Sequence, residues 1–186
     1  MTGEQLIENI NEIYYLVHQA NTRMAILWLE NMVFTWRWWL ELGLTIIPWI
    51  VWFIVRKKES TDRLLYAALV TALIAGYLDY AGIALGLWSY KSQVIPFIPA
   101  FMPWDFTLLP VFTMFFLQYY PKVNPWIKAL LYAGFGSFIV QPFAVYLDLY
   151  DPKQWKHYYS VPFLIVIYLI AHYFAYRSKF KKLDTK

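Results

Sequence analysis

Cysteine is missing from this chain of 186 residues. Its absence excludes disulfide bonds, thiolate metal sites and thiol nucleophiles. Charged residues are also sparse, at 15% of the chain. The motifs of a phosphate-binding glycine loop, a serine nucleophile elbow and a zinc-binding helix are missing too. The sequence therefore predicts neither a metal site nor a cofactor.

Apolar residues dominate what is present: 60% of the chain is hydrophobic and 22% is aromatic. A soluble domain has a smaller apolar share. The basic residues exceed the acidic ones by four, but they lie in short clusters between apolar runs rather than on one long basic stretch. That arrangement is typical of membrane topology and gives no reason to expect nucleic acid as a partner. The sequence predicts an all-α integral membrane protein.

A membrane-spanning helix needs ~20 mostly apolar residues. Five runs meet this requirement, and the basic clusters that follow the first, third and fifth runs are expected to face the cytoplasm. We therefore predict a multi-pass protein of the bacterial cytoplasmic membrane, with the N-terminus outside and the C-terminus inside. The first thirty residues lack a cleavable signal, so the first run is expected to be a retained anchor. The predicted spans are residues 33–55, 64–88, 95–120, 126–148 and 159–177.

The chain is expected to have three parts: residues 1–32, the five-span bundle 33–177 and a basic cytoplasmic tail 178–186. Apolar residues recur at helical spacing in the first part, which predicts an amphipathic helix. That helix is expected to lie on the outer membrane interface or on other helices of the bundle. The residues that carry this pattern are Leu6, Ile10, Ile13, Val17, Met24 and Leu27.

The chain also contains an internal repeat. Y-L-D at 77–79 is followed by Trp88, Tyr90 and P-F, and Y-L-D at 146–148 is followed by Trp155, Tyr158 and P-F. This spacing predicts a parallel duplication of a two-helix unit, or a chance similarity in a sequence of few residue types. In the first case Asp79 and Asp148 are equivalent, and both face the bundle interior beside small residues.

Four acids are expected at similar depth in the outer part of the membrane: Glu41, Asp79, Asp105 and Asp148. An intramembrane carboxylate costs about 2.5–3.5 kcal/mol on insertion scales, so each is a candidate site residue. Asp148 has an alternative role as an interfacial helix cap, and Glu41 as the partner of Arg37 one helical turn earlier. Asp79 and Asp105 are the strongest candidates for a functional pair.

The third run holds several prolines around Asp105. Broken helical backbone at membrane depth is tolerated where it lines a cavity or is buried in protein. Aromatic residues that gather near the acids in sequence are candidate cavity walls, although tryptophan belts are also ordinary at membrane interfaces. The candidate binding residues are Trp38, Glu41, Trp88, Tyr90, Trp104, Gln141 and Asp148.

Long stretches of the chain resemble a family of small multi-span membrane proteins of Bacillus-like spore-forming bacteria. The stretches that carry this resemblance are W-R-W-W, R-K-K-E-S-T-D-R-L-L-Y, L-D-Y-A-G-I-A-L-G-L-W-S-Y, M-P-W-D-F-T-L-L-P-V and Y-S-V-P-F. A glutamate often stands in that family where this chain has Gln141, so no role of an acid is carried over to this position. The resemblance implies a membrane location and no activity.

A shorter stretch is similar to the heterodimer-type lycopene cyclases and the fungal membrane-bound terpene cyclases. An acid before G-x-W and a Pro-x-acid pair carry this similarity, here Asp79, Gly86, Trp88, Pro103 and Asp105. Only one acid stands where the lycopene cyclases tend to have two. The similarity implies a lyase or isomerase that cyclises an isoprenoid or membrane lipid after proton donation by Asp105, assisted by Asp79.

Two other classes of function stay open at this stage. The acids could bind or transport a cation, a proton or a small ligand without catalysis, which needs ionised carboxylates that water can reach. The chain could also be a scaffold of the envelope or spore membrane. The sequence predicts no particular protein partner.

Overall fold

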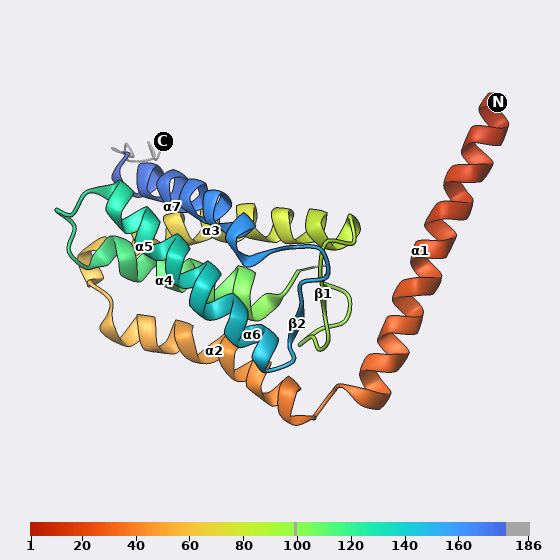
Figure 1. Cartoon of the computed structure of the whole chain (residues 1–186), viewed down its shortest axis with the longest axis horizontal. Helices are drawn as coiled ribbons and strands as arrows, with labels where there is room; N and C mark the ends of the chain where they lie inside the picture. The colour runs from red at the N-terminus through yellow and green to blue at the C-terminus, as the bar shows by residue number, and fades with distance from the viewer. Residues whose placement is uncertain (99, 178–186) are drawn as a thin grey trace, which may run out of the picture.

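The computed structural model describes residues 1–98 and 100–177, and it is helical except for one short β-ladder (Figure 1). The predicted basic tail, residues 178–186, lies outside the described residues. In chain order the main elements are α1 (Gly3–Asn31), α2 (Trp36–Val55), α3 (Thr61–Ala84), β1 (Ser89–Tyr90), α4 (Leu109–Gln118), α5 (Pro125–Phe135), α6 (Gln141–Tyr146), β2 (Tyr150–Asp151) and α7 (Ser160–Tyr176). Two π-helical segments extend these helices, Pro103–Leu108 before α4 and Gly136–Val140 between α5 and α6.

Four helical stretches of the described chain are long and apolar enough to cross a membrane, so the prediction of an all-α membrane protein is confirmed at that level. They match four of the five predicted spans to within a few residues. Side chains at the start of two of these stretches accept hydrogen bonds from the first turn of the helix: Thr35 caps α2, and Asn124 caps α5 just before Pro125. The four stretches are Trp36–Val55, Lys58–Ala84, Pro125–Tyr146 and His157–Tyr176.

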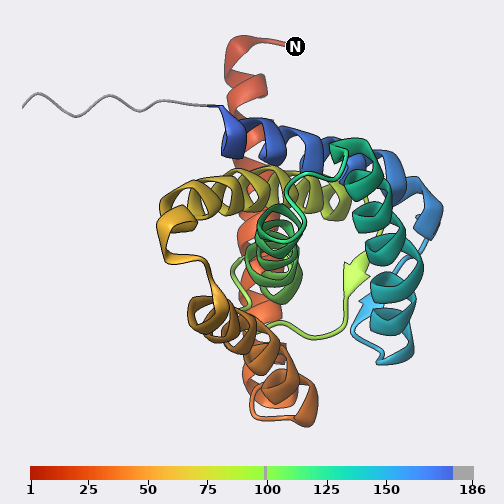
Figure 2. The same ribbon diagram turned by 90° about the vertical axis from the view of Figure 1, so that its left-hand side faces the viewer.

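The third predicted span, residues 95–120, is shorter than expected. Its helix begins only near Pro103 and ends at Gln118. At ~1.5 Å per residue this length is below the ~30 Å of a bilayer core. Figure 2 shows α4 in the middle of a ring formed by α2, α3, α5 and α7. The short helix is thus the centre of the bundle, and its Met114 belongs to the same buried core as Trp52 of α2 and Tyr168 of α7.

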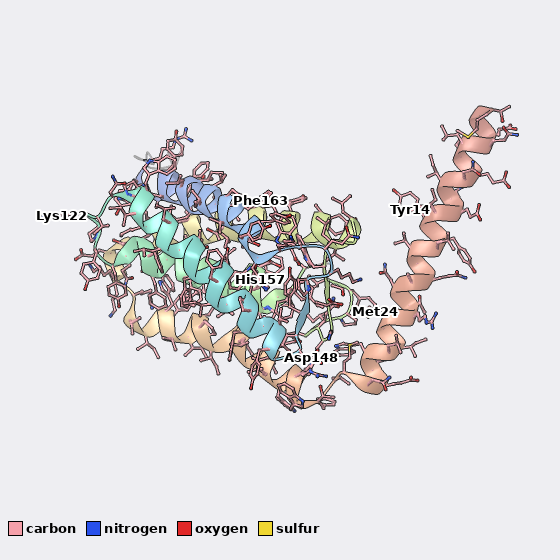
Figure 3. The ribbon with its side chains drawn as sticks, viewed as in Figure 1. Tyr14, Met24, Lys122, Asp148, His157 and Phe163 are labelled. Atoms are coloured by element: carbon pink, nitrogen blue, oxygen red, sulfur yellow. The ribbon has the colours of Figure 1, made fainter. Side chains whose placement is uncertain are left out.

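The N-terminal helix α1 stands apart from the bundle (Figure 1). None of its residues, all of which the structure describes, is buried. Tyr14 projects from it into open space (Figure 3). Of the two places expected for this amphipathic helix, packing on other helices of the bundle is not seen in the described chain, where α1 is hydrogen-bonded to the bundle through Trp28. The other place, the outer membrane interface, stays a prediction.

After α2 the bundle has two halves, the first from α3 to α4 (residues 61–118) and the second from α5 to α7 (residues 125–176). In each half, one helix ends in the same kind of turn. The helix α3 ends in a turn in which Leu87 N–H donates to Gly82 O and Gly86 has a φ of 69°. The α6 end repeats this turn, with Leu149 N–H donating to Ala144 O and a φ of 58° at Asp148. Both turns are Schellman caps. They lead into β1 and β2, which pair antiparallel.

The two caps do not agree with the register of the predicted repeat. Asp148 takes the place of Gly86, not of Asp79, because both residues hold the left-handed position of the cap. The same spacing puts Gln141 at the place of Asp79, and it puts Asp151 at the place of its own ladder partner Ser89. The prediction that Asp148 faces the interior is therefore wrong. A left-handed residue one step beyond the helix end points away from the helix face that the repeat implied.

Candidate active site

An apolar cavity of about 360 Å³ lies near the β-ladder end of the bundle. Side chains from α3, α6, α7 and the π-helical segment before α4 line it. Most of the walls are aliphatic or aromatic, including Leu78, Leu108, Phe143, Leu147, Phe163 and Ile167. Against this background the polar groups at the wall are few, and they fall into two clusters.

Asp79 is the acceptor at the centre of the first cluster. Its Oδ1 accepts hydrogen bonds from Trp88 Nε1 at 2.7 Å and from the Tyr90 hydroxyl at 2.6 Å. Its Oδ2 accepts from the Phe101 backbone N–H at 3.0 Å. The side chain is 6% exposed. Asp79 is thus the acceptor of three hydrogen bonds from groups that are fixed by the backbone or by aromatic rings.

Asp105 lies beside Asp79 and has fewer partners. The same Phe101 N–H that binds Asp79 also lies 2.9 Å from Asp105 Oδ2, and the two carboxyl groups interact directly. Apart from Asp79, the Phe101 N–H is the one hydrogen-bond partner of the Asp105 side chain among residues 1–98 and 100–177. Asp105 is 2% exposed and sits in the π-helical segment, a backbone form found often at functional sites. The sequence prediction that these two acids meet is confirmed in its geometry.

Two aromatic residues hold the first cluster in place. The Trp88 indole lies on Gly82 so closely that a Cβ there would be 1.9 Å from the ring. Tyr90 stacks on Phe101, with the ring centroids 4.4 Å apart. Burial, followed by the charges of Asp79 and Asp105, raises the pKa of Tyr90, so the phenol is a neutral donor. The backbone of α3 and the loop thus fix the donors before any ligand arrives.

The second cluster contains no acid. Ser160 Oγ accepts from Gln141 Nε2 and from Trp155 Nε1, each at 2.8 Å. Gln141 Oε1 lies 3.4 Å from His157 Nδ1. Figure 3 labels His157, in the segment that leads to α7, and Phe163, in the first turn of α7. With two donors already bound, the Ser160 oxygen can offer a further partner only its own hydroxyl proton.

Two predicted site residues lie elsewhere in the bundle. Glu41 is fully buried in α2, where Oε2 accepts from Ser92 at 3.2 Å and Oε1 has no partner in the described chain. Its expected partner Arg37 bonds to Asp148 instead. Trp38 donates to Val94 O at 3.2 Å. Neither Glu41 nor Trp38 lines the cavity.

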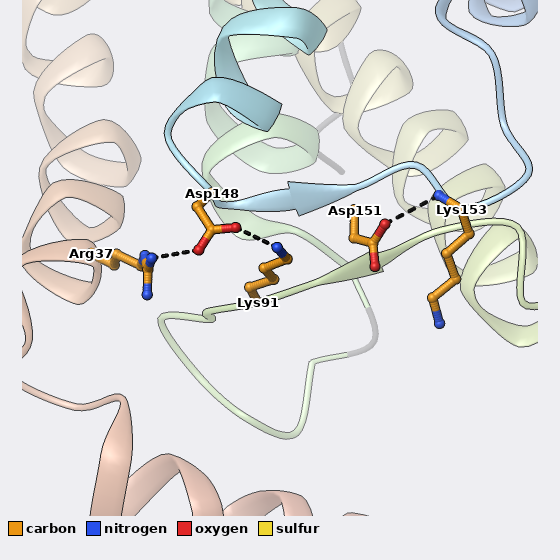
Figure 4. A network of polar contacts seen from close by, with 5 residues as sticks. All are labelled: Arg37, Lys91, Asp148, Asp151 and Lys153. Atoms are coloured by element: carbon orange, nitrogen blue, oxygen red, sulfur yellow. Dashed lines mark hydrogen bonds and ion pairs between the residues drawn. The ribbon is translucent and has the colours of Figure 1, made fainter.

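Asp148 belongs to a surface ion-pair network (Figure 4). It binds Arg37 Nη2 at 2.5 Å and also binds Lys91. The hydrogen bond from Lys91 lowers the pKa of Asp148, and the charges of Lys91 and Arg37 lower it further. Its side chain is 45% exposed, so the alternative of an interfacial, structural acid describes it better than membership of the site.

The structure therefore brings together Asp79, Asp105, Trp88, Tyr90, Trp104 and Gln141 at one cavity. Sequence analysis missed Phe101, Trp155 and Ser160 as members of the site. Trp155 could have been found as the tryptophan of the second copy of the predicted repeat. Ser160 could have been found as the polar residue at which α7 begins. Phe101 contributes through its backbone N–H, which no side-chain motif reports.

Comparison of the chain with protein-family models, with curated proteins and with solved structures finds no match. The site must therefore be interpreted from its own geometry.

Proposed function

We propose that this protein is a membrane-embedded enzyme that cyclises an isoprenoid or a related lipid by proton donation from Asp105. The observation that supports this most is the contrast between the two carboxyl groups at the cavity. Three donors satisfy Asp79, while Asp105 accepts in the described chain only from the Phe101 N–H that it shares with Asp79, and it faces an apolar space.

This contrast divides the roles of the two acids. Two carboxylates side by side in an apolar setting cannot both be ionised at low cost, so the pair holds one proton. Asp79 is the member whose charge is stabilised by donors, so the proton belongs on Asp105. Asp105 is then the general acid, and Asp79 is the group that positions it.

The proposed reaction is an isomerisation. The Asp105 O–H bond breaks and a C–H bond forms at a substrate double bond, or an O–H bond forms as an epoxide C–O bond opens. Electrons of a neighbouring double bond then close a C–C bond to the cationic carbon. The last cation returns a proton to the Asp105 carboxylate, so that the acid is restored and no cofactor is needed.

The cavity walls suit a carbocation. Tryptophan faces attract cations through the ring quadrupole. Trp88, Trp104 and Trp155 all line the cavity, and Trp88 packs edge-on against Trp155 with centroids 5.0 Å apart. The aliphatic walls exclude water, which would otherwise capture the cation.

The second cluster orients the substrate in this proposal. The Ser160 hydroxyl proton is free to bond to an acceptor oxygen, and Gln141 and Trp155 hold that hydroxyl by occupying its lone pairs. A substrate with an oxygen function away from its reactive double bond would be fixed at this end. The reacting end would then meet Asp105.

For the membrane placement, we propose that the β-ladder end faces outward and that α4 serves as a central fifth span too short to reach both surfaces. Lys122 and Asp148 lie at opposite ends of the bundle (Figure 3), which supports placing the cytoplasmic cluster near Lys122. The shared caps support a parallel duplication in the corrected register. The cavity would then open in the outer part of the membrane.

Membranes that contain the parent protein should be incubated with an isoprenoid extract in D₂O and examined by mass spectrometry. We expect a product isomeric with one component of the extract. It should carry one carbon-bound deuterium from the exchanged Asp105 proton where a double bond is protonated, and no retained deuterium where an epoxide opens, because the resulting hydroxyl group exchanges. Asp105→Asn should abolish this product, because the amide still accepts from Phe101 but donates no acidic proton. Asp62→Asn, an exposed acid at the other end of α3, is the matched control and should change nothing.

An Asp105→Asn variant that still forms the deuterated isomer would overturn the proposal. So would a parent protein that forms no isomer and is instead stabilised against heat by a cation at neutral pH, with the stabilisation lost in acid. That result would establish the cation-binding alternative.

A further inference from the structure

The helix α1 is tied to the bundle only at its C-terminal end. Within the described chain its one hydrogen bond to the bundle runs from Trp28 Nε1 to Gln93 O, at 2.7 Å. Toward the N-terminus the helix diverges from the bundle (Figure 1). A helix of 29 residues that buries no side chain has little to stabilise it except its own backbone, so its apolar face needs a partner.

The apolar face has the geometry of a coiled-coil seam. Steps of four and three residues alternate without interruption from Leu6 to Leu27, which is the spacing of d and a positions in a heptad. Two of the three a positions hold the β-branched Ile10 and Val17, a choice that favours two-stranded parallel coils, and the third holds Met24. The large residues of the seam are 37–60% exposed in the single chain. The seam consists of Leu6, Ile10, Ile13, Val17, Ala20, Met24 and Leu27.

The charges of α1 point to protein rather than lipid as its partner. Glu4, Glu8 and Glu12 fall at b, f and c, the outer positions of this heptad, so two copies would not bring them together. The same acids disfavour an anionic membrane surface, which attracts basic helices. Arg23 is the one Lys or Arg residue of α1, where a lipid-binding helix would carry several.

We propose that α1 forms a parallel two-stranded coiled coil with α1 of a second copy of this chain. Two copies inserted in one membrane share one orientation, so their helices leave the membrane side by side with the N-termini at the same end. Confinement to a membrane also raises the effective concentration of the seams, which compensates for their short length. This proposal is independent of the cavity and its chemistry.

The absence of cysteine makes a direct test simple. Val17→Cys and Ile10→Cys each place one thiol at an a position, where the two chains of a parallel coil approach within the ~7 Å between Cα atoms that a disulfide allows. Oxidation of membranes containing the full-length variants should convert most of each into a covalent dimer of twice the 22.2 kDa chain mass. Tyr15→Cys, at an outer f position of the same helix, is the matched control and should stay monomeric.

Each other pattern of cross-links contradicts the proposal in its own way. Dimers from Val17→Cys without dimers from Ile10→Cys would indicate antiparallel helices. Equal dimers from all three variants would indicate random collision. If no variant forms dimers while a water-soluble maleimide labels Tyr15→Cys but not Ile10→Cys, the seam lies in lipid. Cross-links to a chain of different mass would replace the second copy by another protein.

Discussion

The two halves of the bundle have the same frame, which consists of a capped helix, a strand and a tryptophan, but they place different polar residues at the cavity. Each half ends a helix with a Schellman cap, contributes one strand to the ladder and directs a tryptophan N–H to a polar acceptor at the cavity. In the first half the polar groups are the acids Asp79 and Asp105. In the second half they are the neutral Gln141 and Ser160.

This difference shows that the same backbone arrangement can be built with buried acids or with neutral polar residues. The second half holds its loop and its tryptophan without any buried carboxyl group, so the frame itself does not require acids. Burying two neighbouring carboxyl groups carries a cost in stability that neutral residues avoid. The frame seen in the second half thus does not need the acids of the first half, and the following substitutions test how far the two halves are alike.

The largest effect is expected from Gly82→Ala. The second half already has Ala144 at the equivalent position, but in the first half the new methyl group would meet the Trp88 ring. We expect a loss of about 1–3 kcal/mol in the free energy of unfolding, because overpacking displaces the indole from Asp79. Gly134→Ala, where the methyl group meets open space, should be neutral or stabilising by up to about 1 kcal/mol.

Denaturation in detergent, followed by tryptophan fluorescence, measures both variants. If Gly82→Ala were as stable as Gly134→Ala, the contact between Trp88 and α3 would not matter to the fold, and the first half would tolerate the second half's residue.

A smaller effect is expected from Gly86→Ala at the cap of the first half. The left-handed φ of Gly86 costs an alanine about 1–2 kcal/mol, partly offset by the lower entropy of the unfolded alanine chain, so we expect a net loss of about 1 kcal/mol. No atom crowds this position, so a larger loss would indicate a contact other than backbone strain. Thermal unfolding of parent and variant provides the measurement.

The smallest effect is expected at the equivalent cap residue of the second half. Asp148→Asn keeps a residue that tolerates the left-handed conformation and removes the charge that binds Arg37 and Lys91. The native pKa of Asp148 is lowered below the ordinary 3.8. The charge of Asp148 therefore stabilises the fold at pH values above 3.8. That stabilisation is lost as the pH falls through the lowered native pKa.

Melting temperatures of parent and Asp148→Asn should therefore differ slightly at neutral pH and coincide at a pH below both values. High salt should shrink the neutral-pH difference, since the pair is exposed. A difference that persists unchanged in strong acid would show that the substitution acts through packing rather than charge.

Much of the fold was predictable because bilayer thickness imposes a length on apolar runs. Four spans could be located to within a few residues from composition alone. The third could not, because the described residues just before Pro103 are as apolar as a span and yet lie outside any helix, where the Phe101 N–H donates to Asp79 and Asp105. Hydropathy reports burial in apolar surroundings and does not distinguish lipid from protein.

The level of the four acids along the bundle was predictable from the sequence, but the direction in which their side chains point was not. The rise of a helix places Asp79, Asp105, Glu41 and Asp148 near one level, and all four do lie toward the ladder end. Which of them face one cavity depends on helix rotation and on single backbone angles. The left-handed φ of Asp148 turns it to the surface, and a neighbouring loop encloses Glu41 beside Ser92.

The π-helical segment that carries Asp105 determines where this side chain lies relative to α4. An α-helix closes its hydrogen bonds four residues back and a π-helix five, so Pro103–Leu108 holds one residue more than an α-helix of the same rise. Removing that surplus residue would rewind the segment as an α-helix and move Asp105 relative to the side chains of α4. The proximity of Asp105 to Asp79 is thus set by the count of backbone residues, and deletion of a single one would separate the two carboxyl groups while leaving both in the chain.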